Sequence, residues 1–404
     1  MKNYLKEMRK KDLFVSNHLN ELKGKKTFLR IDTNSAVVDG ELDLDSYKLF
    51  AHSKTLKKYV DNGVIPIIVT HQGRKGDEDF VANLKPIAEK MEELSGVNVK
   101  YVNEVMGDEV HNAIKHLNPG EALMIKNVRD TPDETCTECL SEMINLPLTK
   151  FFRKEVELSI NDGLSVCHRN QTSVVALSQV LPYYYGFLLE SELEALQDVI
   201  KDLVDGKEVT FFVGGKKFEK LNYLEKILEY PGAKFATGGL IGQYIAYAAD
   251  VKFNQENKDL LTKEEIEIAK NLLEKFKDKI SYPIDYNLDN GNVVDREKLQ
   301  FSKGVVMDIG PETLDLYAKA INGRCVFAGV MGVFEKGFTK TLDLLRLASG
   351  PKTVDLGGHS SAALFQDHGI FEYFTKKGGK VLTAGGAALS LLAGDDLPGL
   401  EVRL

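Results

Sequence analysis

Arginine and histidine side chains that could bind an anion recur in the first half of this sequence, each time soon after an apolar segment. With their polar neighbours they are Arg30, Asp32 and Asn34, then His71 and Arg74, then Arg129, and finally His168 and Arg169. A guanidinium group can bind a phosphate or a carboxylate through two parallel hydrogen bonds. A group of such side chains in an acidic protein predicts a site for a small ligand with several negative charges.

Glycine pairs follow four apolar segments in the second half of the chain. They are Gly214-Gly215, Gly238-Gly239, Gly357-Gly358 and Gly385-Gly386. Because glycine has no side chain, its backbone N–H can approach a phosphate closely, and a helix that begins there adds positive potential. One pair could be an ordinary tight turn, but four pairs favour a site for a nucleotide-sized anion. Neither of the common phosphate-binding motifs, GxxxxGK[ST] and GxGxxG, occurs.

The segments that must position these residues alternate between strand-like and helix-like patterns. The predicted strands include Lys26–Asp32, Val64–Thr70, Val97–Val102 and Ala122–Ile125, and the predicted helices are Tyr47–Asn62, Leu84–Leu94 and Glu109–Leu117. Such alternation is typical of βαβ units on a parallel sheet. Ligands bind beyond the carboxyl ends of the strands in these sheets. We therefore expect the basic side chains to converge at one edge.

The alternation is interrupted near the middle of the chain by a long amphipathic helix predicted at Glu190–Val204, and it resumes at Val209–Val213. We therefore predict an α/β protein with two doubly wound, Rossmann-like parallel-sheet domains. Residues 1–185 would form an N-terminal domain for the small anion, 186–204 the interdomain helix, and 205–390 a C-terminal nucleotide domain. One domain for a small anion and one for a nucleotide is the layout of a kinase that closes by a hinge motion and expels water before phosphoryl transfer.

Composition excludes several other classes of protein. The chain has 404 residues, with 52 Lys and Arg against 60 Asp and Glu, and its net charge of −8 argues against a nucleic-acid partner. The longest apolar run, Val64–Val69, is far too short to cross a membrane. The first residues, Met1–Lys6, have no apolar signal core, and four cysteines do not make a disulfide framework. We therefore expect a cytoplasmic enzyme.

Several motifs together resemble the phosphoglycerate kinase family, and the resemblance covers nearly the whole chain. Arg30–Asn34 resembles the family's R-x-D-x-N, Thr70–Arg74 its S-H-x-G-R, Lys126–Arg129 its E-N-x-R, Gly214–Lys217 its G-G-A-K, Asp308–Pro311 its D-I-G-P, and Gly332–Glu335 its G-V-F-E. The resemblance implies reversible phosphoryl transfer between ATP and the carboxylate of 3-phosphoglycerate, which gives 1,3-bisphosphoglycerate. It also implies that a tail, residues 391–404, returns to the N-terminal domain.

The resemblance further implies roles for individual residues. The residues that bind the substrate would be Asp32, Asn34, Lys48, His71, Arg74, Arg129 and Arg169. The catalytic residues would be Lys48, Arg169 and Lys217. Nucleotide binding would fall to Gly214, Gly215, Lys217, Glu335, Gly357, Gly358, His359 and Ser360. The resemblance implies no metal held by the protein itself, because Mg²⁺ would arrive on ATP or ADP.

Some positions depart from the family pattern. Lys48 stands where most of the family has a transition-state arginine, and lysine lacks the planar guanidinium fork. His359 replaces the usual aspartate, as in the archaeal branch of the family, and Ala328 replaces an asparagine. A paralogous kinase for another anionic carboxylate, or a non-catalytic nucleotide-binding regulator, is therefore an alternative. Cys136 and Cys139 form a lone CxxC, most simply interpreted as surface thiols.

Overall fold

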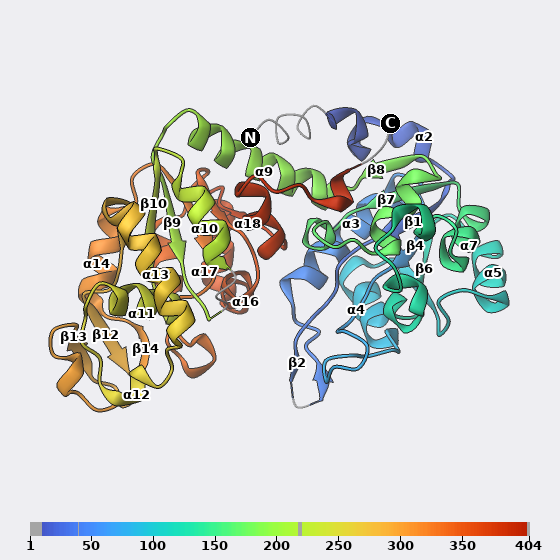
Figure 1. Ribbon diagram of the computed structural model, residues 1–404. Helices are drawn as coiled ribbons and strands as arrows, with labels where there is room; N and C mark the ends of the chain where they lie inside the picture. Colours follow the sequence, from blue (N-terminus) through green and yellow to red (C-terminus); the bar gives the residue numbers. More distant parts are fainter. Residues whose placement is uncertain (1–9, 39, 217–219, 402–404) are drawn as a thin grey trace. The chain divides into compact units, whose positions relative to one another are not determined.

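The computed structural model describes residues 10–38, 40–216 and 220–401. The chain divides into two compact units (Figure 1). The first comprises the described residues up to Glu194 together with those from Gly394 onward, and the second runs from Ala195 to Ala393. Each unit is built on a six-stranded, all-parallel sheet. The predicted fold class, two Rossmann-like α/β domains, is confirmed.

The sheet of the first unit has the strand order β5-β6-β4-β1-β7-β8. Its strands are β1 (Lys26–Arg30), β4 (Ile65–Val69), β5 (Asn98–Val102), β6 (Glu121–Ile125), β7 (Leu158–Asn161) and β8 (Tyr183–Tyr185). The last residue of β1, Arg30, pairs with Val69 on one side and with Asn161 on the other. The carboxyl ends of the three central strands are therefore level, and the residues that follow them share one edge.

Helices cover both faces of this sheet. Phe28 and Leu29 are neighbours in β1 but belong to different apolar clusters, because successive side chains of a strand point to opposite faces. The cluster around Leu29 contains apolar residues of α3 (Tyr47–Asp61) and α4 (Lys85–Ser95). The cluster around Phe28 contains those of α5 (Asp108–Lys115), α7 (Pro147–Glu155) and α8 (Thr172–Val175). Burial on both faces explains why the central strand β4 is apolar and buried along its whole length.

The second unit has the strand order β11-β10-β9-β15-β16-β17. The strands are β9 (Val209–Val213), β10 (Ala233–Thr237), β11 (Ile280–Ser281), β15 (Arg324–Ala328), β16 (Thr353–Asp355) and β17 (Lys380–Val381). The helices are α10 (Lys220–Leu228), α11 (Gly239–Ala248), α12 (Gln255–Lys258), α13 (Lys263–Phe276), α14 (Pro311–Lys319), α15 (Lys340–Leu347), α16 (His359–Gln366), α17 (His368–Lys376) and α18 (Gly386–Leu392). The strand order reverses between β9 and β15, and such a point is where ligands bind in open α/β sheets.

A small antiparallel sheet in the second unit was not predicted from the sequence. It consists of β12 (Asp285–Leu288), β13 (Val293–Asp295) and β14 (Val306–Ile309), in the order β13-β12-β14 (Figure 1). Its first strand begins with the buried Asp285, and a charged residue at this position makes the segment look less like a strand in the sequence. The carboxylate of Asp285 accepts hydrogen bonds from the backbone N–H groups of Glu312 and Thr313 in the first turn of α14.

The long helix near the middle of the chain is α9 (Phe187–Val204), three residues longer at its start than predicted. Asp162 caps the start of this helix, since its carboxylate accepts hydrogen bonds from the backbone N–H groups of Leu188 and Leu189 in the first turn. Within the first unit, Tyr183 and Tyr185 donate their hydroxyl hydrogens to the carbonyls of Gly399 and Leu400, near the end of the described chain. In the described residues, no helix combines the length and apolar character needed to cross a membrane.

Candidate functional site

The basic residues of the first unit gather at the carboxyl edge of its sheet. Asp32 follows β1, His71 follows β4, and Arg129 lies in the short helix η3 (Val128–Asp130) after β6. Arg169 follows the turn after β7. Nδ1 of His71 lies 3.9 Å from Oδ1 of Asp32, and the guanidinium group of Arg169 is close enough to lower the pKa of Arg129. The predicted convergence of these side chains is therefore observed.

Asp32 is the buried acidic centre of this group. Its Oδ2 accepts hydrogen bonds from Nζ of Lys48, on α3, and from the hydroxyl of Ser165, while its Oδ1 accepts one from the backbone N–H of Asn34. Burial by itself would raise the pKa of Asp32, but the charge of Lys48 and the hydrogen bonds from Lys48 and Ser165 hold that pKa well below its ordinary value. Asp32 is therefore a permanent anion that orients Lys48.

The arginines around Asp32 repel one another. Burial is the main reason why the pKa of Arg129 falls to about 10, and the positive charges of Arg169 and Arg30 lower it further. This group of described residues contains four basic side chains and two buried carboxylates. The basic residues are Arg30, Arg129, Arg169 and Lys48, and the carboxylates belong to Asp32 and Glu134. The site therefore has an excess of positive charge, which an anionic ligand would neutralise.

Three buried nitrogens in this group have no hydrogen-bond partner among the described residues. They are Nε of Arg129, Nε of Arg169 and Nε2 of His71. A buried polar group without a partner is costly, so nearly all such groups are paired in native proteins. Three of them in one cationic cluster are available to an anionic ligand.

Two further predicted residues occupy different surroundings. Oδ1 of Asn34 accepts a hydrogen bond from the backbone N–H of Gly73, 2.7 Å away, and thereby holds the loop after β4. Only glycine fits at position 73, where φ is +62° and a Cβ atom would lie 2.2 Å from the carbonyl oxygen of Asp79. The side chain of the next residue, Arg74, is exposed.

In the second unit, the glycine loops pack backbone against backbone beyond the strand ends. A Cβ atom on Gly214 would lie 2.1 Å from the carbonyl oxygen of Val330, and one on Gly239 would lie 2.8 Å from the backbone nitrogen of Gly215. The loops after β9, β10 and β15 are therefore in close contact. The helices α11, α16 and α18 begin at glycines or directly after them, so their N–H groups lie at this same edge.

The predicted nucleotide-binding residues are distributed around this edge. Gly357 and Gly358 follow β16 with φ values of +105° and +81°, and His359 is the exposed first residue of α16. Ser360 is buried, and its hydroxyl donates to Asp355 instead of facing solvent. Glu335 is exposed in the short helix η9 (Phe334–Lys336). The predicted catalytic residue Lys217 lies outside the described residues.

Two ionisable residues that the sequence analysis did not single out also lie at this edge. Nζ of Lys220, the first residue of α10, donates to the carbonyl oxygens of Gly214 and Ala328, at 3.4 and 3.3 Å. Asp355, the last residue of β16, is fully buried, and its Oδ2 has no hydrogen-bond partner among the described residues. Burial raises the pKa of Asp355 to about 7, although Ser360, Gly357 and Lys220 act in the opposite sense.

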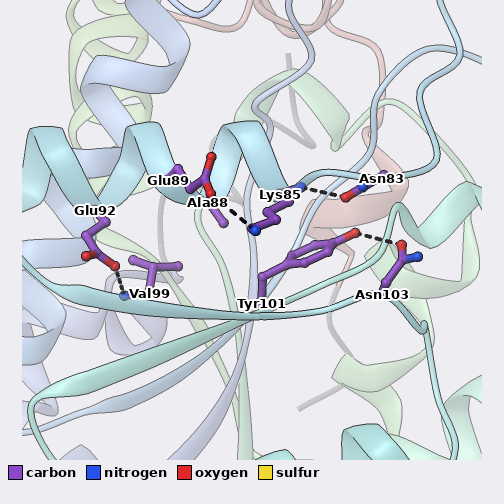
Figure 2. Close-up of a pocket in the computed structure, with 8 residues that line it drawn as sticks. All are labelled: Asn83, Lys85, Ala88, Glu89, Glu92, Val99, Tyr101 and Asn103. Carbon is purple, nitrogen blue, oxygen red and sulfur yellow. Dashed lines mark hydrogen bonds and ion pairs between the residues drawn. The ribbon is translucent and has the colours of Figure 1, made fainter.

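A hollow elsewhere on the first unit contains none of the predicted site residues (Figure 2). It has a volume of about 580 Å³ and lies between α4 and the edge strand β5. Its polar side chains bond locally: the hydroxyl of Tyr101 donates to Asn103, and Lys85 pairs with Glu89. Cys136 and Cys139 are both exposed free thiols, and no cluster of three potential metal-binding side chains occurs among the described residues.

Comparisons with known proteins show which family this chain resembles. The family model of phosphoglycerate kinase matches residues 17–395. The chain is 30% identical over 396 residues to a phosphoglycerate kinase of Thermococcus onnurineus, covering 94% of this chain and 93% of that protein. It is 31% identical over 402 residues to one of Methanopyrus kandleri, covering 95% and 96%.

A solved structure is similar over the same length. The crystal structure of phosphoglycerate kinase from Pyrococcus horikoshii superposes with a TM-score of 0.83 at 28% sequence identity, covering 94% of this chain and 96% of that chain. A match that covers 94% of this chain includes both units. The chain belongs to the phosphoglycerate kinase family.

Proposed function

We propose that this protein transfers the γ-phosphoryl group of ATP reversibly to the carboxylate of 3-phosphoglycerate, forming 1,3-bisphosphoglycerate and ADP. The observation that carries the proposal is the set of three buried, partnerless nitrogens on Arg129, Arg169 and His71 within a cluster of excess positive charge. A ligand with a phosphate and a carboxylate offers acceptors for all three. Membership of the phosphoglycerate kinase family supports the same ligand.

The first unit would bind the acceptor, 3-phosphoglycerate. Arg129 and Arg169 would donate to its anionic oxygens, with His71 as a further donor. Lys48 would lie beside the acceptor while its ammonium is oriented by Asp32. Asn34 would act indirectly by holding the loop that carries His71 and Arg74.

The second unit would bind the nucleotide at the reversal point between β9 and β15. The loops at Gly214-Gly215 and Gly357-Gly358 would donate backbone N–H groups to its phosphates, and α16 would add the positive potential of its N-terminus. We propose that Glu335 lies near the ribose, His359 and Ser360 near the phosphates, and Lys217 beside the transferring group. Mg²⁺ enters as part of the Mg–ATP substrate.

The chemistry asks for positioning and charge neutralisation more than for covalent participation by the protein. A carboxylate oxygen of 3-phosphoglycerate attacks the γ-phosphorus, and the bond from that phosphorus to the bridging oxygen of ADP breaks. The transferring group carries its negative charge on three oxygens, so cations aligned beside it lower the barrier. Lys48, Arg169 and Lys217 are the residues proposed for this role.

A coupled assay with purified protein, Mg–ATP and 3-phosphoglycerate tests the proposal by following 1,3-bisphosphoglycerate formation. We expect turnover within the range of roughly 1–10³ per second that is usual for enzymes. No turnover, together with intact ADP binding measured by calorimetry, would contradict 3-phosphoglycerate as the acceptor. ADP release with other anionic carboxylates would then identify a paralogous kinase, and its absence with every acceptor would indicate a nucleotide-binding regulator.

A further inference from the structure

His71 is fully buried at the end of β4, and only one of its two ring nitrogens has a close protein partner among the described residues. Nδ1 lies 3.2 Å from Nη2 of Arg30, whereas Nε2 has no hydrogen-bond partner there. Which ring nitrogen carries the proton decides whether His71 can donate or accept a hydrogen bond at the ligand side. Oδ1 of Asp32 lies 3.9 Å from the same Nδ1, beyond hydrogen-bond distance, so the closer contact with Arg30 decides this question.

A guanidinium group can only donate hydrogen bonds, and it stays protonated in proteins. Nδ1 of His71 must therefore act as the acceptor, which leaves the ring proton on Nε2. A second proton on Nδ1 would point at the guanidinium and is excluded. Burial is the main factor that lowers the pKa of His71, and Arg30, Arg129 and Arg169 lower it further against the opposing effect of Asp32. His71 is therefore neutral, with an N–H bond on Nε2.

Arg30 can hold this arrangement because its own position is fixed on its other side. Its Nε donates to the hydroxyl oxygen of Ser173, at 2.9 Å, and its Nη1 donates to the carbonyl of Ile31. Arg30 is buried in β1, so its guanidinium cannot swing into solvent. The two hydrogen bonds made by Nε and Nη1 thus hold Nη2 of Arg30 in place against Nδ1 of His71.

Ser173, at the start of α8, is in turn held by Glu134. Its hydroxyl donates to Oε1 of Glu134 at 2.7 Å, and its backbone N–H donates to Oε2 at 2.9 Å. Glu134 is fully buried in the short helix η4 (Pro132–Glu134) and is the negative charge that most favours protonated Arg30. The hydrogen bonds therefore run in one direction, from Arg30 through Ser173 to Glu134.

We propose that Glu134 is a positioning residue that acts through Ser173 and Arg30 to fix His71 as a neutral imidazole with its proton on Nε2. His71 then serves as a fixed hydrogen-bond donor to an anionic oxygen of the acceptor, and not as an acid or a base. The last step rests on the proposed function, whereas the tautomer of His71 does not. Because the N–H on Nε2 always donates, it favours an ionised oxygen, which can only accept. A hydroxyl group is less favoured, since its own hydrogen must also find an acceptor.

The tautomer can be read without substrate, by nuclear magnetic resonance of the full chain labelled with ¹⁵N-histidine. His71→Gln assigns the His71 signals among the 8 histidines of the chain. We expect an unprotonated Nδ1 and a protonated Nε2, unchanged between about pH 5.5 and 8. A proton on Nδ1, or a titration of His71 near its ordinary pKa of about 6.5, would overturn the proposal.

The role of Glu134 is tested with Glu134→Gln and Ser173→Ala, against Asp133→Asn as the matched control. Asp133 is the buried neighbour of Glu134, but its carboxylate accepts from the backbone N–H of Leu148 and does not contact Arg30 or Ser173. We expect both test variants to mix the His71 tautomers and to raise the KM for 3-phosphoglycerate about tenfold, with little change in ADP affinity. An unchanged His71 spectrum in both variants would overturn the positioning role, even if the wild-type protein showed no turnover.

Discussion

Nζ of Lys48 lies 2.5 Å from Oδ2 of Asp32, and Lys48 is the residue for which the sequence analysis expects an arginine in most of the family. The side chain of Lys48 is one-quarter exposed, whereas that of Asp32 is almost completely buried. An incoming acceptor must therefore share Lys48 with an anion that is already in contact with it. An arginine could bind both partners through separate nitrogens, but a lysine presents a single nitrogen.

Replacing Lys48 tests how much this shared ammonium contributes. Lys48→Met should lower kcat by about 10²-fold, the loss typical for removing one group that stabilises transition-state charge. Lys48→Arg should keep kcat or increase it, because the guanidinium can contact Asp32 and the transferring group together. Steady-state kinetics with 3-phosphoglycerate and ATP measure both effects.

Lys57→Met is the control on the same helix, since Lys57 is exposed and pairs with Asp61 one turn away. Kinetics of Lys57→Met should match those of the wild type. If Lys48→Met also retained wild-type kcat, Lys48 would have no catalytic role.

Removing one of the mutually repelling arginines should separate stability from function. In Arg169→Met, the remaining Arg129 and Arg30 lose a neighbouring positive charge that lowers the pKa of Arg129. We expect a melting temperature equal to or higher than that of the wild type, together with a KM for 3-phosphoglycerate raised at least tenfold. Thermal unfolding and steady-state kinetics on the same preparation check the two effects.

The comparison variant is Arg153→Met, which removes an exposed arginine from α7 in the same unit. It should leave KM unchanged. A clear fall in the melting temperature of Arg169→Met would show that Arg169 holds the fold together and would contradict an anion site under electrostatic strain.

Asp355 should make stability depend on pH in an unusual direction. Burial raises its pKa in the folded protein to about 7, against 3.8 for the unfolded chain, so the unfolded state releases this proton first as the pH rises. The contribution of Asp355 to stability is therefore present below about pH 4 and is lost as the pH rises towards 7. Between pH 5 and 7, wild-type protein should lose on the order of 2–3 kcal/mol relative to Asp355→Asn.

Urea unfolding of both proteins at several pH values measures this difference, and taking the difference cancels groups that titrate in both. The exposed Asp315→Asn provides the control, for which we expect no pH-dependent difference from the wild type. Parallel curves for Asp355→Asn and wild type would mean that Asp355 is ionised in the folded protein throughout this range.

The sequence predicted those parts of the fold and site that depend on local pattern. Strand β9 has the predicted limits because Val209–Val213 consists of β-branched and aromatic residues and is buried on both faces. Asp32 and His71 could be found because they directly follow such strands. Glu134 and Ser173 could not be found in this way, since they lie 39 residues apart in the sequence. Only the folded chain brings Ser173 into contact with both Glu134 and Arg30.

Polar residues inside strands were missed for a different reason. Asp355 interrupts an apolar run that leads into Gly357, a signal that could have been noticed, although its burial and raised pKa depend on packing. Asp285 hid the small antiparallel sheet in the same way, because a charged residue at a strand start lowers the apolar content of a four-residue strand. Arg74 was selected because it follows soon after a predicted strand. In the structure it lies beyond the tight turn at Gly73, and its side chain is exposed.

Lys220 should support nucleotide binding by joining two loops of the second unit. Its ammonium donates to the carbonyls of Gly214 after β9 and Ala328 at the end of β15, and a Cβ atom on Gly329 would lie 2.8 Å from Nζ. Hydrogen bonds to a charged group contribute about 1.5–3 kcal/mol each, more than neutral ones. Losing them in Lys220→Met should loosen both loops where the phosphates would bind.

Calorimetry with the full chain should therefore show that Lys220→Met binds ADP at least tenfold more weakly, with binding of 3-phosphoglycerate unchanged. The control is Lys226→Met, at an exposed position in the same helix, which should bind ADP like the wild type. Equal ADP affinity in all three proteins would show that the loops keep their geometry without the Lys220 ammonium. A loss of 3-phosphoglycerate binding in Lys220→Met would contradict the assignment of the nucleotide to the second unit.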